Sequence, residues 1–332
     1  MAVKVALHPR HGPHQPTTET PARLDGSVRR TTSIDMLRPD GPGGPLQLRG
    51  RGRDIVTGFD GAAAWRGKAS FEAEVDYMGS REVLSLAVHP DDPGAGGLVG
   101  ISASSGFRGA LDRSFPPGDF AGSLLYALLD DLPVATLVSG YAISAAGHAH
   151  PRAGRAAAHP DICAGWVTGG TIMGAIDEVG RNPVVTGPAA PRLDGGPDPL
   201  AWHAMDVLPA HGMRRRRRLD VSGGDELAID SMFRDSHVAP DGRETVVHEY
   251  TLAAAVDRSS GVVLSCRATA QVLPWVECPA AADSATRVAG RSLDDLRSWV
   301  RSDLVGVTTC THLNDMLRSL ADVGALSPPT RN

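Results

Sequence analysis

The alternation of apolar and polar residues is clearest in the C-terminal part of the chain, where it predicts four consecutive strands followed by a helix. Links of only a few residues, several of them containing glycine, separate the strands and favour antiparallel pairing. The predicted strands cover about 213–221, 227–238, 245–257 and 261–273. The helix is predicted over about 311–324, because Leu313, Met316, Leu317 and Leu320 recur at three- and four-residue spacing.

The same alternation predicts which side chains face the core, since neighbouring residues of a strand point to opposite faces. On the second of these strands, Phe233 shares a face with Asp235 and His237. On the third strand, His248 shares a face with Tyr250. Polar and ionisable side chains are therefore expected among apolar neighbours on the core side of the sheet.

Three pairs of segments indicate an internal repeat. Residues 28–36 match 213–221 in two arginines and an aspartate, and residues 46–54 match 227–235, both ending in Arg-Asp. Residues 122–132 keep three leucines in register with 310–320. The matches follow the same order at offsets of 185, 181 and 188 residues. The predicted fold is therefore α+β, an internally duplicated pseudo-dimer in which each half has an antiparallel sheet of about four strands with packed helices.

The repeat divides the chain into five parts. The first repeat, which has diverged, is expected over 27–145, and the second over 211–326. Residues 1–26 are rich in Pro, His and Thr and are expected to form a flexible arm. Residues 146–210 are rich in Gly and Pro and are expected to be a linker or a lid, and residues 327–332 a tail.

The run of five arginines from 214 to 218 lies on the first strand of the second repeat. A strand sends Arg215 and Arg217 toward the core, where a guanidinium without a carboxylate is very costly. Asp235 is the expected partner of Arg215, and Arg30 with Asp54 repeats the pair in the first half. A structural ion pair is favoured over anion binding, but Arg215, Arg217 and His237 are also candidate substrate-binding residues.

Composition and charge restrict the function. The chain has 332 residues, 42% of them apolar, and a net charge of −5, which argues against a general nucleic-acid binder. The longest uncharged stretch, 132–147, is too short to span a bilayer. Four cysteines and the absence of a charged-then-apolar leader favour a cytoplasmic protein. The expected partner is a small molecule.

The candidate chemistry gathers at the start of the C-terminal helix. Cys310 and His312 lie where the helix dipole favours a thiolate, and Asp235, His248 and Cys278 could meet them if the helix packs on the sheet. Three alternatives remain open. They are simple packing, a metal site, with zinc the candidate ion, formed by Cys278, Cys310, His312 and His248, and a nucleophilic cysteine served by His312, His248 and Asp235.

Two comparisons within the sequence bear on this site. The first repeat has Gly122, Leu124, Gly67 and Asp92 near the positions of Cys310, His312, His248 and Cys278, so any chemistry is expected only in the second repeat. The linker offers a second candidate zinc set. It consists of His148, His150, His159 and Cys163.

Several motifs resemble those of a bacterial family catalogued as domain of unknown function 2889. The motifs are Arg-Arg-Arg-Leu-Asp-Val, Phe-Arg-Asp-Ser-His, Val-Val-His-Glu-Tyr, Leu-Pro-Trp-Val-Glu-Cys-Pro and Cys-Thr-His-Leu, within about 211–325. The resemblance implies that the family's shared polar residues correspond to Asp235, His248, Cys278, Cys310 and His312. It implies no activity.

Two functions therefore remain as hypotheses. The first is a bacterial small-molecule enzyme acting on an organic acid or an acyl thioester, since two related sheets commonly enclose a cavity where they meet. The second is a non-catalytic small-molecule-binding or scaffold protein, in which the cysteines and histidines belong to the core. Convergence of these side chains in one site discriminates between the two.

Overall fold

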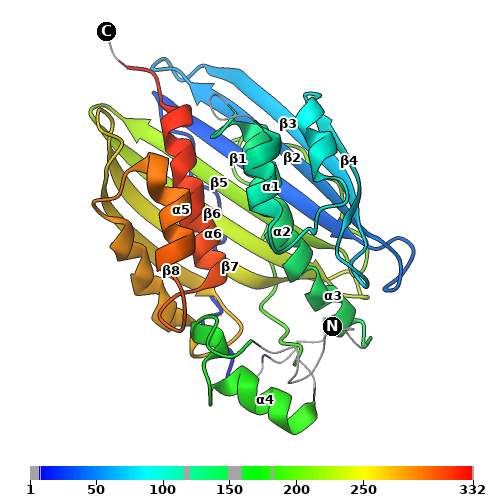
Figure 1. The fold of residues 1–332 in the computed structure, drawn as a ribbon. Coiled ribbons are helices and arrows are strands. Elements are labelled where there is room, and N and C mark those ends of the chain that lie inside the picture. The colour runs from blue at the N-terminus through cyan, green and yellow to red at the C-terminus, as the bar shows by residue number, and fades with distance from the viewer. Residues whose placement is uncertain (1–6, 8, 116–119, 149–158, 181–182, 331–332) are drawn as a thin grey trace.

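A computed structural model describes residues 7, 9–115, 120–148, 159–180 and 183–330, and its main feature is one antiparallel sheet of eight strands (Figure 1). The strand order is β4-β3-β2-β1-β5-β6-β7-β8. The first half contributes β1 (Ser27–Leu37), β2 (Leu46–Thr57), β3 (Ala63–Val75) and β4 (Val83–His89). The second half contributes β5 (Met213–Gly223), β6 (Glu226–Val238), β7 (Glu244–Asp257) and β8 (Val263–Val272). The predicted antiparallel strands of the second half are confirmed, with ends within two residues.

The two halves are joined through their first strands. β1 and β5 pair antiparallel from Val28 opposite Val221 to Met36 opposite Met213, with Thr32 opposite Arg217 at the centre. The α+β fold of two four-stranded halves is therefore confirmed, but the halves form one continuous sheet instead of two sheets facing one another. Two sheets that face one another can enclose a cavity, but sheets joined edge to edge do not. The expected cavity between the halves therefore has no basis in this arrangement.

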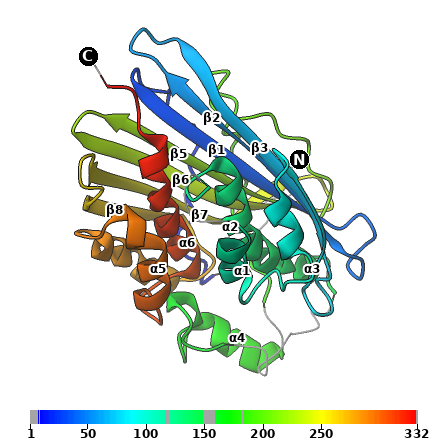
Figure 2. The same cartoon turned by 45° about the horizontal axis from the view of Figure 1, so that its top comes forward.

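Helices cover one face of this sheet (Figure 2). Over the first half lie α1 (Phe107–Ser114), α2 (Leu124–Val138) and α3 (Gly140–Ala145), preceded by the 3-10 helix η1 (Pro93–Leu98). Over the second half lie α5 (Leu293–Asp303), α6 (Thr311–Ser319) and the 3-10 helices η4 (Cys278–Val288) and η5 (Leu320–Leu326). The predicted helix at 311–324 is thus an α-helix that tightens after Ser319. Each half packs its helices over an apolar core of its own.

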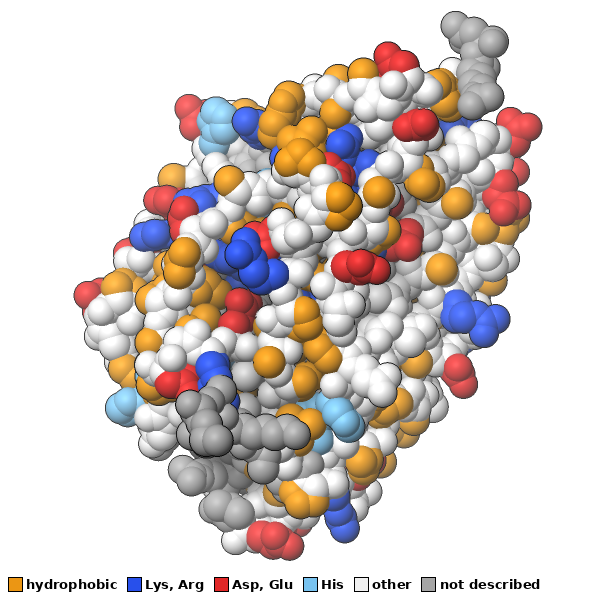
Figure 3. Space-filling model, turned by 180° about the vertical axis from the view of Figure 1, so that it is seen from behind, with side chains coloured by type: hydrophobic (Ala, Val, Ile, Leu, Met, Phe, Trp, Pro, Cys, Tyr) orange, Lys and Arg blue, Asp and Glu red, His pale blue; other side chains and the backbone are white. Residues whose placement is uncertain are grey.

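The opposite face is crossed by the segment between the halves and by the N-terminal segment. Pro188 accepts a hydrogen bond from the backbone N–H of Val246, and Leu193 and Trp202 pack with Met232 of β6. Thr17 donates its backbone N–H to Glu249. The described part of the expected flexible arm is therefore held against the sheet. Charged side chains of both signs are scattered over the molecule when it is seen from this side (Figure 3).

The arginine run divides between the two faces as alternation predicts. Arg215 and Arg217 lie on the helix face, where they pair with Asp235 and Asp131. Arg214, on the other face, pairs with Asp35 at 2.5 Å. Arg216 and Arg218 follow it there, near Glu244 and Asp230 respectively. Each of the five arginines has a carboxylate partner within the fold, and they form no exposed basic stripe.

One helical stretch, Leu124–Ala145, is long and apolar enough to cross a membrane by length and composition alone. In this fold 78% of its most apolar window is buried inside the protein.

Two short helices follow in the segment between the halves. Ala164–Trp166 form the 3-10 helix η3, and α4 (Thr171–Val179) lies beyond the end of the sheet (Figure 1).

Candidate functional site

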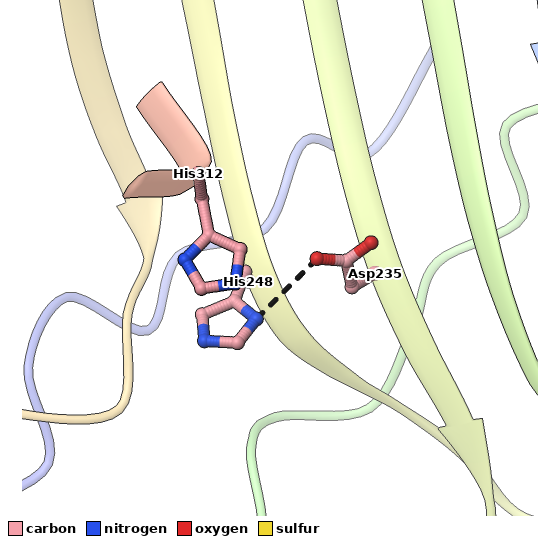
Figure 4. A group of neighbouring side chains, drawn as sticks. All are labelled: Asp235, His248 and His312. Carbon is pink, nitrogen blue, oxygen red and sulfur yellow. Dashed lines mark ion pairs between the residues drawn. The ribbon is translucent and has the colours of Figure 1, made fainter. Parts of the chain in front are cut away.

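Asp235, His248 and His312 come together from three elements on the helix face of the second half (Figure 4). β6 and β7 pair Asp235 directly with His248, and their register shifts immediately after Asp235. α6 begins at Thr311 and packs on the sheet through Leu313, so His312 in its first turn lies over His248. The sequence predicted that these residues meet if the helix packs on the sheet. The structure shows this packing, and the three residues converge.

The three side chains lie close together without a well-formed hydrogen bond between them. His248 Nδ1 lies 3.4 Å from Asp235 Oδ2, yet this buried nitrogen makes no hydrogen bond to any described residue. The His248 and His312 rings stack with their centroids 3.9 Å apart and their planes inclined by 25°. One ligand atom from each of the three residues can be chosen so that all lie within 4.8 Å of one another.

Arg215 holds Asp235 from the other side. Its Nε donates to Oδ1 at 2.8 Å and its Nη2 to Oδ2 at 3.1 Å, so the predicted ion pair is confirmed. Both side chains are essentially inaccessible, with exposed fractions of 1% and 0%. Burial alone raises the pKa of Asp235, but the charge of Arg215 and the neighbouring imidazoles outweigh it and hold the pKa well below its usual range. The carboxylate is therefore ionised.

Phe233 links the arginines to His312. Its ring lies 4.9 Å from the Arg215 guanidinium and 5.7 Å from that of Arg217. The same ring stacks on His312, with 6.4 Å between the centroids. Burial and the neighbouring His248 lower the pKa of His312 well below its ordinary value, and both arginines add to this effect. His312 is therefore neutral and available as a ligand or base.

Cys310 adjoins the group through His312. The Sγ atom lies 4.0 Å from His312 Nδ1, and the side chain is buried. Burial raises the pKa of the Cys310 thiol to about 11, although the N–H groups of Leu313 and His312 favour the thiolate. The thiolate expected from the helix dipole is therefore wrong for this environment. The pKa of this thiol is raised while that of the adjacent His312 is lowered, so the thiol does not readily give its proton to His312, which disfavours a nucleophilic cysteine.

Cys278 is not part of the three-residue group. It starts η4, and a Cβ atom on Gly165 would come within 2.7 Å of its Sγ atom. Cys163 is brought to the same corner, because Ala164 donates its backbone N–H to the carbonyl of Thr309 at 2.9 Å. Among the described residues, the set with metal-ligand spacing contains Asp235 and neither Cys278 nor Cys310.

The remaining candidates lie elsewhere or outside the described residues. His237 packs against Tyr141 and His211, with centroid distances of 5.2 and 6.1 Å. His150, from the zinc set considered in the linker, is outside the described residues. The approach of Cys163 to Cys278 and Cys310 was not expected, because nothing in the linker sequence indicates where it docks.

Two cavities among the described residues lie away from the three-residue group. A cavity of about 30 Å³ at the junction of the halves is lined by charged side chains including Arg30, Asp131 and Arg217, and its size admits about two water molecules. A shallow surface groove of about 520 Å³ runs beside Trp299 of α5. The apolar cavity suggested from the sequence is found at neither place.

Residues 213–325 match the family described as "Protein of unknown function (DUF2889)". The match begins with β5 and ends within η5, so it includes Asp235, His248, Cys278, Cys310 and His312. No curated protein matches the chain. The family-matched region therefore coincides with the half that carries the candidate site, while the first half has a similar four-stranded sheet outside the match.

Proposed function

We propose that this protein is a metal-dependent enzyme acting on a small organic acid or acyl thioester, with Asp235, His248 and His312 as ligands of one zinc ion. The observation that carries the proposal is the position of His248 Nδ1, 3.4 Å from Asp235 Oδ2, which is longer than a well-formed hydrogen bond. Two ligand atoms of a tetrahedral zinc ion are separated by about 3.3–3.5 Å. The two atoms are thus spaced as neighbouring ligands.

The chemistry of the donor set also fits. Two imidazoles and one carboxylate are a common catalytic zinc set, and three protein ligands leave a position for a substrate or water. His312 contributes a neutral imidazole, because its pKa is lowered well below its ordinary value. Such an ion supplies Lewis-acid chemistry when bound. Arg215 fixes the orientation of the Asp235 carboxylate, as outer-sphere partners of metal ligands do.

A metal-free acid–base site is the second candidate. It is favoured by the two hydrogen bonds from Arg215, which already compensate the charge of Asp235. His248 would then exchange protons with a substrate while Asp235 orients its ring. The scaffold alternative is supported by the burial of Cys278 and Cys310 as neutral thiols. Neither alternative requires the protein to retain zinc.

Zinc titration of the metal-depleted protein by calorimetry tests the proposal. We expect one zinc per chain, with binding abolished in His248→Gln and His312→Gln. His237→Gln is the matched control, because His237 is a buried histidine of β6 that lies outside the group. Equal zinc binding by all four proteins, or none by the wild type, would refute the proposed centre.

We also propose that the first half is a diverged copy of the second. The Arg30–Asp54 and Arg215–Asp235 pairs occupy corresponding positions on β1–β2 and β5–β6. The last strand of each half begins with a similar backbone hydrogen bond. The N–H of Val83 in β4 donates to the Ile101 carbonyl, and the N–H of Val263 in β8 donates to the Arg291 carbonyl. Superposition of experimental coordinates should place Asp54 on Asp235. A different strand correspondence would contradict the duplication.

A further inference from the structure

The two corresponding arginines differ in one nitrogen. Arg30 uses Nε and Nη2 on Asp54, and its Nη1 donates to the Gly122 carbonyl at 2.9 Å and to Asp322 at 3.1 Å. Arg215 uses the same two nitrogens on Asp235, but its buried Nη1 has no hydrogen-bond partner among the described residues. The second half therefore leaves a buried cationic donor unsatisfied where the first half satisfies it.

The difference arises at the start of the covering helix. In the first half the chain before α2 presents the Gly122 carbonyl to Arg30. In the second half the carbonyls of Thr309 and Cys310 at the start of α6 accept the N–H groups of Ala164 and Asn314, at 2.9 and 2.8 Å. An unsatisfied buried donor is costly, and more so when it is charged, so its retention points to an acceptor from outside the chain.

Arg217 shows the same pattern two residues along β5. Its Nε and Nη2 both bond Asp131, with Nη2 at 2.7 Å, and its buried Nη1 has no partner among the described residues. Both guanidinium groups lie over the Phe233 ring, which stacks on His312. Two unsatisfied donors therefore flank the ring that adjoins the proposed zinc ligand.

The charges decide which acceptor fits. Arg215 and Arg217 are each paired with one carboxylate, Asp235 and Asp131 respectively, so these two pairs carry no net charge. A divalent ion brings an excess of two positive charges. We infer that Nη1 of Arg215 and Nη1 of Arg217 form a subsite for the carboxylate group of a small acidic substrate. This rests on the proposed zinc centre and adds the substrate class to it.

The recognition is by charge-assisted hydrogen bonds. Each Nη1 carries two N–H groups, and a carboxylate has two oxygens that can accept from both arginines. The charges of Asp131 and Asp235 are already engaged by the opposite edges of the same guanidinium groups. A neutral amide of the same shape lacks the charge and should bind much more weakly.

Acetate binding to the cobalt-substituted protein tests the subsite, because a ligand beside the ion changes the visible spectrum of cobalt. We expect sodium acetate, at constant ionic strength, to change the spectrum saturably, and acetamide to have no effect at the same concentrations. In the double variant Asp131→Asn/Arg217→Gln, acetate affinity should fall about tenfold or more while cobalt stoichiometry stays at one. The double change avoids leaving Asp131 unpaired.

Arg216→Gln is the matched control, since Arg216 is the neighbouring arginine of β5 but lies on the opposite face near Glu244. It should bind acetate as the wild type does. If the wild type binds no metal, the proposed centre fails and the subsite with it. If metal binds but acetate does not change the spectrum, or binds the double variant equally well, the subsite is refuted while the zinc centre stands. Should the double variant not fold, equal binding of acetamide and acetate by the wild type would still refute it.

Discussion

The two halves of the sheet place the same ion pair in two different surroundings. In the first half Asp54 pairs across the sheet with Gly67, and in the second half Asp235 pairs with His248. In both halves the register of the neighbouring strands shifts directly after the aspartate. The local backbone is therefore alike, and the imidazole is present in one half only.

The covering helices differ in the same way. Near Leu124 at the start of α2, a Cβ atom on Gly52 would lie 2.9 Å from the leucine side chain, so this corner is packed with apolar atoms. In α6 the comparable corner holds His312 over His248. The comparison shows that the Arg–Asp pair serves the sheet in both halves, whereas the imidazoles are not needed for this fold.

The largest expected effect concerns the two aspartates. Asp235→Ala leaves Arg215 buried without a carboxylate and should lower the free energy of unfolding by about 3–5 kcal/mol. Asp54→Ala should cost less, because Arg30 keeps Asp322 and the Gly122 carbonyl. Urea unfolding of both variants measures the difference. Equal losses would show that the additional partners of Arg30 contribute nothing.

Acid should weaken the second half through His312. The pKa of His312 is lowered in the folded protein, so the unfolded chain binds a proton more readily as the pH falls below about 6.5. The free energy of unfolding should therefore decrease between pH 7 and pH 5. His312→Leu gives this position the residue of the first half and should lose less stability over the same interval. Denaturant unfolding at pH 7 and pH 5 measures these losses. Equal losses of unfolding free energy in the wild type and His312→Leu would contradict this account.

The first half should influence the zinc ligands without contributing one. Arg108 of α1 donates to Asp315 at 2.6 Å, three residues after His312 on α6. Arg108→Gln removes this link and should weaken zinc binding by about tenfold, as changes beside metal ligands do. Arg113→Gln is the control, since Arg113 is an exposed residue at the end of the same helix. Unchanged zinc affinity in Arg108→Gln would show that α6 is positioned by its own half.

The smallest effect is expected at Gly67. No atom lies within 4 Å of the position where its Cβ would be, so Gly67→His should change the free energy of unfolding by no more than about 0.5 kcal/mol. The zinc stoichiometry should remain one, because Leu124 still occupies the place of the second imidazole. Thermal unfolding and metal analysis of the variant check both statements. Two zinc ions per chain would mean that one added histidine is enough to create a zinc site in the first half.

The period-two pattern was sufficient to predict the strands of the second half and both Arg–Asp pairs. Strand alternation depends on local geometry, and a buried arginine on one strand needs a carboxylate on the next. The repeat alignment placed His248 at the position that corresponds to Gly67, and the strand pairing agrees, since His248 faces Asp235 as Gly67 faces Asp54. Joining of the halves through β1 and β5 could not be predicted, since either edge of a four-stranded sheet can pair.

The chemistry of the site was predicted less well, for identifiable reasons. Spacing indicated that Cys310 and His312 start a helix, but burial of the thiol outweighs the helix dipole and raises its pKa. Cys163 is held beside Thr309 because the next residue, Ala164, donates its backbone N–H to the Thr309 carbonyl, and a backbone hydrogen bond cannot be predicted from residue type. Asp235 was expected near His248, yet its place in a set with metal-ligand spacing depends on side-chain positions that alternation does not fix.

The composition of the metal's first coordination shell tests the central claim most directly. X-ray absorption of the zinc-loaded protein should show only nitrogen and oxygen neighbours, at about 2.0–2.2 Å. That result would agree with Asp235, His248 and His312 as the ligands. Sulfur neighbours at about 2.3 Å would contradict it and would identify Cys278 or Cys310 as ligands instead.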